Sequence, residues 1–105
     1  MIVIFEKEYL QELYETGKCS SKKHRYQPEI VSKFKDRINI LKRVAKVESL
    51  FTINSLNYEV LKGNKAGISF IRINKQYRIE FTVTKQKDEP VVSVCNIIEL
   101  SNHYK

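Results

Sequence analysis

The chain has 105 residues, of which 42% are hydrophobic and 30% charged, with a net charge of +7. This length predicts one domain over residues 1–105, and the composition excludes a membrane span and, with three glycines, a glycine-rich phosphate loop. We expect a basic cytoplasmic protein, with no membrane association, whose partners are nucleic acid or an acidic protein.

The first half of the chain predicts one strand and two helices. The stretch MIVIF, residues 1–5, is apolar throughout and predicts a strand buried on both faces. A helix follows and should end at Gly17, and after a polar basic linker a second helix should run from Pro28 to Lys46. The apolar residues at helical spacing are Tyr9, Leu10, Leu13 and Tyr14, and then Ile30, Val31, Phe34, Ile38 and Leu41.

The second half predicts strands. A short extra turn of helix is expected at residues 47–51, and strands at 56–61, 68–73, 77–84 and 91–98. Asn74, Lys75 and Gln76 suit a hairpin connection. The predicted fold class is α+β, with an N-terminal strand and two helices packed on an antiparallel sheet of C-terminal strands.

Charge is unevenly distributed along the sequence. Residues 18–46 hold ten cations and two acids, a balance of +8, whereas residues 1–17 sum to −3. Such a block is more typical of a binding face than of a surface that is basic only for solubility.

The residues that usually hold metals or act as nucleophiles are sparse. Cys19 and Cys95 are far apart in sequence and form no CxxC motif, so we expect two free thiols. The two histidines lie in no metal-binding motif. The sequence predicts neither a metal site nor a cofactor.

The strands from residue 61 to residue 81 are rich in cations. Alternation places Arg72 and Asn74 on one face of the sheet and Ile71 and Ile73 on the other. Arg78 lies on a strand whose alternate residues are apolar, so its side chain should also point away from the core and its removal should cost little stability. Two interpretations stay open: a solvated face whose arginines pair with acids such as Glu80, or a surface that binds phosphate. The cations of this stretch are Lys62, Lys65, Arg72, Lys75 and Arg78.

The C-terminal residues are Asn102, His103, Tyr104 and Lys105. Histidine changes charge near neutral pH, tyrosine stacks on bases, and lysine adds a cation. Beside the cationic strands, this tail would complete a surface for handling RNA. The alternative is a frayed terminus.

Three stretches of the sequence resemble one known family. RINKQYRIEF is similar to the R-I-N-x-Q-[W/Y]-R-I-x-F segment of HigB-like toxins, which belong to the RelE/ParE superfamily of type II toxin–antitoxin systems. LKGNKAGISF resembles the family's preceding L-K-G-x-x-x-G-x-x-S stretch, and YETG resembles the end of its first helix. The order of predicted elements fits that family over the whole chain.

The resemblance implies a microbial RNase-like fold, ribosome-dependent cleavage of mRNA without a metal, and neutralisation by a helix-turn-helix antitoxin of the HigA type. It implies that Arg78 lies near the scissile phosphate and that Arg72 is on the same surface. His103 and Tyr104 fall where the family ends in Asp-Tyr-His, with Asn102 in place of the carboxylate. Glu59 and Val60 stand where many relatives have His-Pro.

Cleavage of RNA through its 2′-hydroxyl needs a base, an acid and charge stabilisation at phosphorus. Arg72 and Arg78 suit the stabilising role, His103 or Glu59 that of base, and Tyr104 or His103 that of acid. Lys62, Lys65, Asn74, Lys75, Asn102 and Lys105 are predicted to bind RNA. Two alternatives remain, namely a gyrase-inhibiting protein of the ParE type and a basic RNA-binding module without catalysis.

Overall fold

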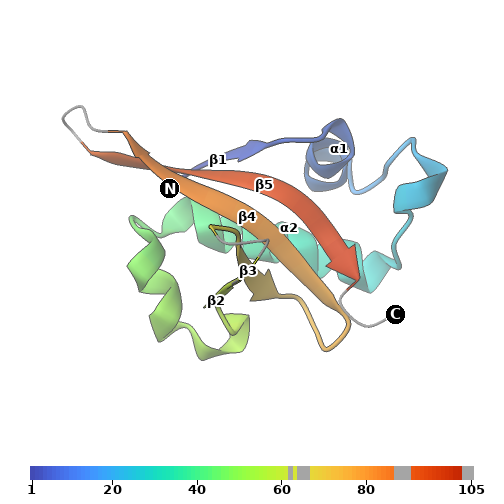
Figure 1. The fold of residues 1–105 in the computed structure, drawn as a ribbon. Helices are drawn as coiled ribbons and strands as arrows, with labels where there is room; N and C mark the ends of the chain where they lie inside the picture. The colour runs from blue at the N-terminus through green and yellow to red at the C-terminus, as the bar shows by residue number, and fades with distance from the viewer. Residues whose placement is uncertain (62, 64–66, 87–90, 103–105) are drawn as a thin grey trace.

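The computed structural model describes residues 1–61, 63, 67–86 and 91–102. Two helices and a five-stranded sheet form an α+β fold, with the helices lying against one face of the sheet (Figure 1). The predicted fold class is confirmed. The strands are β1 (Ile2–Phe5), β2 (Glu59–Val60), β3 (Ser69–Arg72), β4 (Tyr77–Gln86) and β5 (Val92–Asn102).

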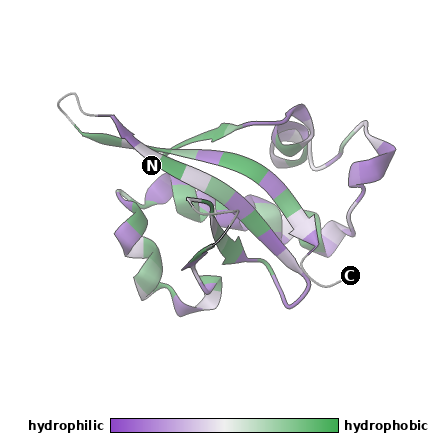
Figure 2. Ribbon diagram, viewed as in Figure 1, coloured by the Kyte–Doolittle hydropathy of each residue, from purple (hydrophilic) through white to green (hydrophobic). Residues whose placement is uncertain are grey.

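The sheet has the order β1-β5-β4-β3-β2 and is mixed. The four C-terminal strands pair antiparallel in sequence order, as predicted, whereas β1 pairs parallel to β5. Hydrophobic and hydrophilic residues alternate along β4 and β5 (Figure 2). One face therefore carries the core and the other, here called the open face, carries most of the polar side chains.

Strand β1 corrects the expectation of burial on both faces. Ile2 and Ile4 are 50% and 48% exposed, whereas Val3 and Phe5 pack against the core. The reason is that β1 is an edge strand with helices on one side only, so alternate residues face solvent.

Helix α1 (Glu8–Thr16) buries Tyr9, Leu10 and Leu13. It ends as predicted at Gly17, whose φ of 78° is the left-handed conformation that glycine adopts without strain. The Gly17 N–H donates to the Leu13 carbonyl at 3.0 Å, and this bond closes the last turn.

Helix α2 (Pro28–Arg43) begins at the predicted proline and ends three residues before the predicted Lys46. Val44 already has extended backbone angles. Carbonyl groups in and just after the last helical turn, those of Leu41, Lys42 and Val44, accept hydrogen bonds from the Met1 amino group, which ties β1 to this end of α2.

The segment between α2 and β2 is mostly 3₁₀ helix. The predicted extra turn is present as η2 (Val47–Thr52), followed by η3 (Asn54–Leu56). Leu56 therefore belongs to a helical turn and not to the predicted strand, because Asn57 takes the left-handed conformation and reverses the chain. Strand β5 is longer than predicted and extends to Asn102.

The core lies between the two helices and the sheet. Apolar side chains of the helices pack against those of the strands. The helices contribute Leu10, Leu13, Phe34, Ile38 and Leu41, and the strands contribute Ile71, Ile79, Phe81, Cys95 and Ile97. A bulge between β4 and β5 places Glu80 opposite Glu99 but Phe81 opposite Ile97. The extra residue of β5 lets both Ile97 and Leu100 be buried.

Both cysteines are free thiols, as predicted, but they differ in environment. Cys95 is fully buried, and burial raises the pKa of its thiol to about 12. Cys19 is half-buried.

We therefore expect iodoacetamide at pH 8 to alkylate Cys19 in the native protein and to leave Cys95 unmodified. The thiolate is the reactive form, and at pH 8 a thiol of this pKa is ionised in about one molecule in 10,000. Mass spectrometry of peptides measures both sites, and the protein unfolded in guanidinium, in which both thiols react, is the control. Equal labelling of the two native thiols would contradict the buried position of Cys95.

Candidate nucleic-acid interface

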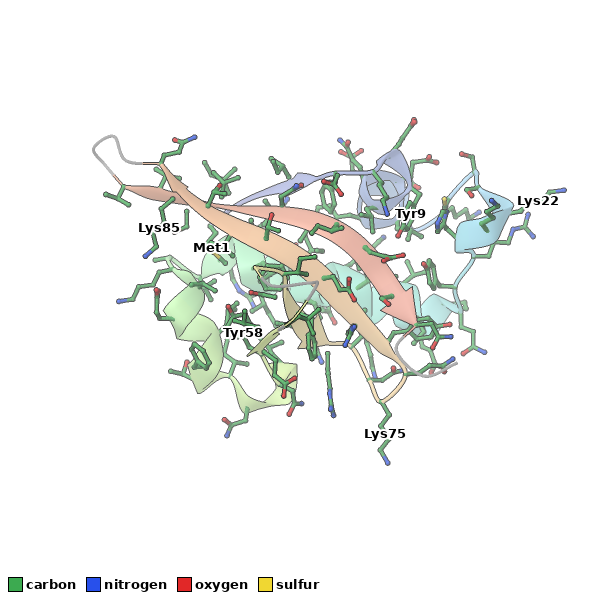
Figure 3. All side chains as sticks on the ribbon, viewed as in Figure 1. Met1, Tyr9, Lys22, Tyr58, Lys75 and Lys85 are labelled. Atoms are coloured by element: carbon green, nitrogen blue, oxygen red, sulfur yellow. The ribbon has the colours of Figure 1, made fainter. Side chains whose placement is uncertain are left out.

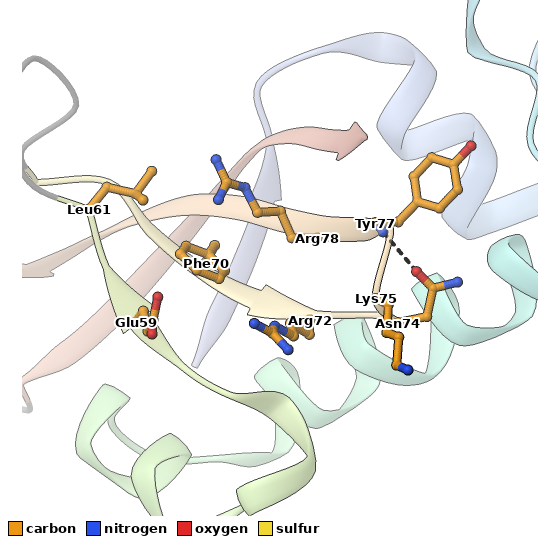
Figure 4. A pocket seen from close by; sticks show the side chains of 8 residues that line it. All are labelled: Glu59, Leu61, Phe70, Arg72, Asn74, Lys75, Tyr77 and Arg78. Atoms are coloured by element: carbon orange, nitrogen blue, oxygen red, sulfur yellow. Dashed lines mark hydrogen bonds between the residues drawn. The ribbon is translucent and has the colours of Figure 1, made fainter. Parts of the chain in front are cut away.

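A pocket of about 210 Å³ opens on the open face, where β2, β3 and β4 lie side by side. Figure 4 shows the side chains that form it, which come from all three strands and from the turn between β3 and β4. They are Glu59, Leu61, Phe70, Arg72, Asn74, Lys75, Tyr77 and Arg78. Three of these eight are cations and one is an acid, so the pocket is suited to an anion.

Arg72 and Arg78 are direct cross-strand partners on β3 and β4. Their side chains share the open face, as alternation predicted, and both line the pocket. Like charges placed opposite each other on a sheet repel and destabilise it. Among the described residues, no carboxylate lies within ion-pair distance of the Arg72 guanidinium. A phosphate in the pocket would supply an anionic partner for Arg72.

Arg78 is held from two sides. Its Nε and Nη2 atoms each lie 3.0 Å from Oε2 of Glu80, and its Cζ lies 4.5 Å from the centre of the Phe70 ring. The side chains of Arg78 and Glu80 are only 11% and 3% exposed.

This geometry corrects one expectation from the sequence. The prediction that Arg78 points away from the core holds, but its removal should not be cheap, because it forms a nearly buried ion pair. The pairing of Arg78 with Glu80 agrees with the interpretation in which the arginines pair with acids. The position of Arg72 fits the interpretation in which the surface binds phosphate. The two arginines of one motif therefore differ in environment.

The turn between β3 and β4 is fixed by Asn74. Its Oδ1 accepts hydrogen bonds from the backbone N–H groups of Gln76 at 2.8 Å and Tyr77 at 2.7 Å. This bonding occupies the amide oxygen in shaping the turn, which is a structural role beside the predicted one in RNA binding. Lys75 is exposed at the tip of the turn and extends away from the sheet (Figure 3).

The remaining predicted site residues lie at or beyond the end of β5. Asn102 pairs with Tyr77 across β4 and β5 and is exposed, so it lies beside the pocket without lining it. The other predicted residues lie outside the described part of the chain: Lys62, Lys65, His103, Tyr104 and Lys105.

Two aromatic members of the site were not foreseen. Phe70 forms the surface beneath the Arg78 guanidinium, and Tyr77 borders the pocket while its ring points away from the other lining side chains and packs against the core (Figure 4). Phe70 could have been predicted from the sequence, because it lies two residues before Arg72 on the same strand and must therefore share its face of the sheet. Tyr77 also packs edge-on against Tyr26, with ring centres 5.6 Å apart.

Comparison with solved structures identifies the fold. A YoeB/ParE toxin from Agrobacterium tumefaciens matches with a TM-score of 0.62 and 20% sequence identity, over 99% of this chain and 100% of that chain. The chain therefore has the fold of that toxin. A search of curated proteins gives no match.

The family is shown by sequence. The model of a family described as the RelE-like toxin of type II toxin–antitoxin system HigB matches residues 3–94. The chain thus belongs to the HigB-like family of type II toxins, which confirms the resemblance seen in RINKQYRIEF. A type II toxin implies a protein antitoxin as partner. No helix of the described residues has the length and apolar character needed to cross a membrane.

Proposed function

We propose that this toxin is an endoribonuclease that needs no metal, cuts mRNA on the ribosome and so stops translation. The observation that carries the proposal is a pair of arginines, opposite each other in the register of β3 and β4, in a pocket that Glu59 also lines. Arginine binds phosphate through paired hydrogen bonds, so Arg72 and Arg78 are suited to a phosphodiester and to the extra charge of its transition state.

The chemistry requires only groups that the chain has. The ribose 2′-oxygen attacks the neighbouring phosphorus, the bond to the 5′-oxygen breaks, and a cyclic phosphate and a free 5′-hydroxyl result. Glu59, which lines the pocket, is the base proposed to take the 2′-hydroxyl proton, with His103 as the alternative, and Arg72 is proposed to stabilise the phosphorane. His103 and Tyr104 stay proposed as the groups that return a proton to the leaving oxygen.

The ribosome would supply what the pocket lacks, which is a fixed mRNA conformation. Orientation of the attacking hydroxyl contributes up to roughly 7–11 kcal/mol in favourable cases. The block of +8 charge at residues 18–46 would contact ribosomal RNA. The antitoxin proposed for this chain is a helix-turn-helix protein of the HigA type.

Expression of the chain by itself is expected to arrest growth by stopping translation first. The measurement follows incorporation of labelled leucine and labelled thymidine over the minutes after induction. Primer extension on a reporter mRNA, incubated with purified protein and translating ribosomes, should show new 5′ ends that do not form without ribosomes.

Two outcomes would decide against this proposal. If thymidine incorporation falls while leucine incorporation continues, gyrase inhibition of the ParE type explains the toxicity. If translation stops but the reporter mRNA stays intact, the chain acts as an RNA-binding module without catalysis.

A further inference from the structure

A second hollow surface lies away from the pocket, between the C-terminal end of α1 and the N-terminal end of α2. Two adjoining cavities of about 300 and 470 Å³ share Gly17, Lys18, Tyr26 and Val31, and together form what we call the helix-end groove. Its lining has no residue in common with that of the pocket on the open face.

The floor of the helix-end groove is apolar. Leu13 and Val31 are buried core residues that reach it from the two helices, and half-buried Cys19 and Tyr26 reach it from the linker. Pro28 adds an exposed apolar ring at the start of α2. This floor offers helical side chains such as leucine a place to pack.

The rim of the groove is cationic. Lys18, Arg25 and Lys35 line it, and no aspartate or glutamate is among the lining residues. The Lys35 side chain lies across the end of α1. Its Nζ is so close to Gly17 that a β-carbon at that position would be only 3.1 Å away. The ammonium group is thereby held at the edge of the apolar floor.

We propose that the helix-end groove is the docking surface for an acidic amphipathic segment of the antitoxin. The inference rests on membership of the type II toxin family and not on ribonuclease activity. Apolar side chains of the segment pack on the floor around Val31, while its carboxylates meet the lysines of the rim. Complementary charge of this kind speeds association and sets which partner binds.

The floor favours protein over RNA as the occupant. A phosphate backbone would use the rim cations but would leave the apolar floor without a partner, whereas an amphipathic helix uses both. The groove is also structurally joined to the catalytic face. Tyr26 donates to the Leu100 carbonyl at 3.0 Å and packs against Tyr77, a residue that borders the pocket.

The test measures direct binding. The probe is the purified antitoxin encoded by the reading frame beside that of this chain, titrated against full-length toxin by calorimetry. In the variant Lys18→Glu/Lys35→Glu, we expect affinity to fall at least tenfold, and the loss to shrink as salt rises, because rim charges are screened. Ser32→Trp, which fills the groove without changing its charge, should weaken binding as well.

The matched control is Lys33→Glu/Lys46→Glu, which makes the same change in net charge at exposed positions outside the groove. It should bind the antitoxin within about threefold of the wild type. Equal losses in the two double variants, or unchanged binding in Ser32→Trp and the groove variant, would overturn the proposal. So would a groove variant that keeps antitoxin affinity and loses binding to purified ribosomes, since the occupant would then be RNA.

Discussion

Replacing Arg72 by alanine is expected to slow ribosome-dependent mRNA cleavage by about 100- to 1000-fold, which is the usual cost of removing one preorganised donor from a transition state. The fold should persist, because the Arg72 side chain is exposed and makes no ion pair within the described residues. Its backbone carbonyl keeps the hydrogen bond that it accepts from Arg37 Nε at 3.1 Å. Primer extension under single-turnover conditions measures the rate, and circular dichroism checks the fold.

Two further variants separate charge from geometry. Arg72→Lys keeps the charge but loses the planar fork, so its rate should fall between those of the wild type and the alanine variant. Lys85→Ala removes an exposed cation from the far end of β4, outside the pocket and outside residues 18–46, and should cleave at the wild-type rate. Full activity in folded Arg72→Ala would remove the pocket from the mechanism.

Replacing Arg78 by alanine is expected to damage stability as well as cleavage. The substitution deprives the nearly buried Glu80 carboxylate of its guanidinium partner and uncovers the Phe70 ring. Breaking such a pair costs about 3 kcal/mol, which corresponds to a fall in Tm of roughly 12 °C or more for a chain of this size. Urea titration and thermal melting measure the loss.

A double variant distinguishes the role of Arg78 in stability from its role in cleavage. Arg78→Met with Glu80→Gln replaces the charged pair by neutral groups, and the thioether can pack on Phe70. We expect it to recover at least half of the lost stability and none of the lost cleavage. If its cleavage returns with its stability, Arg78 supports the fold and takes no part in the reaction. If Arg78→Ala has the same Tm as the wild type, the ion pair contributes nothing to stability.

Local patterns were enough to predict most of the elements. The apolar spacing around Leu10 and Leu13, with Gly17 as the stop, specified α1 because each of those signals acts over a few residues. Pro28 likewise marked the start of α2. The alternation of Arg72 with Ile71 and Ile73 placed that arginine on the open face.

The errors came from features that depend on distant parts of the chain. β1 was expected to be buried on both faces, but Ile2 and Ile4 are exposed because the helices cover only one face of the sheet, which no local pattern encodes. The end of α2 depends on Met1, some forty residues away. The sequence motif was enough to predict the two arginines of the site. Only the strand register showed that they lie opposite each other on β3 and β4.

The facing arginines also bear on how such a protein evolves. Arg72, which has no carboxylate partner among the described residues, is a site where the unliganded chain gives up stability in exchange for affinity to an anion. A neutral replacement of Arg72 would remove this uncompensated charge and, under the proposed mechanism, would at the same time abolish cleavage. Selection for a harmless toxin and selection for a sturdier one would therefore favour the same substitution, so inactive lineages could accumulate without any loss of fold.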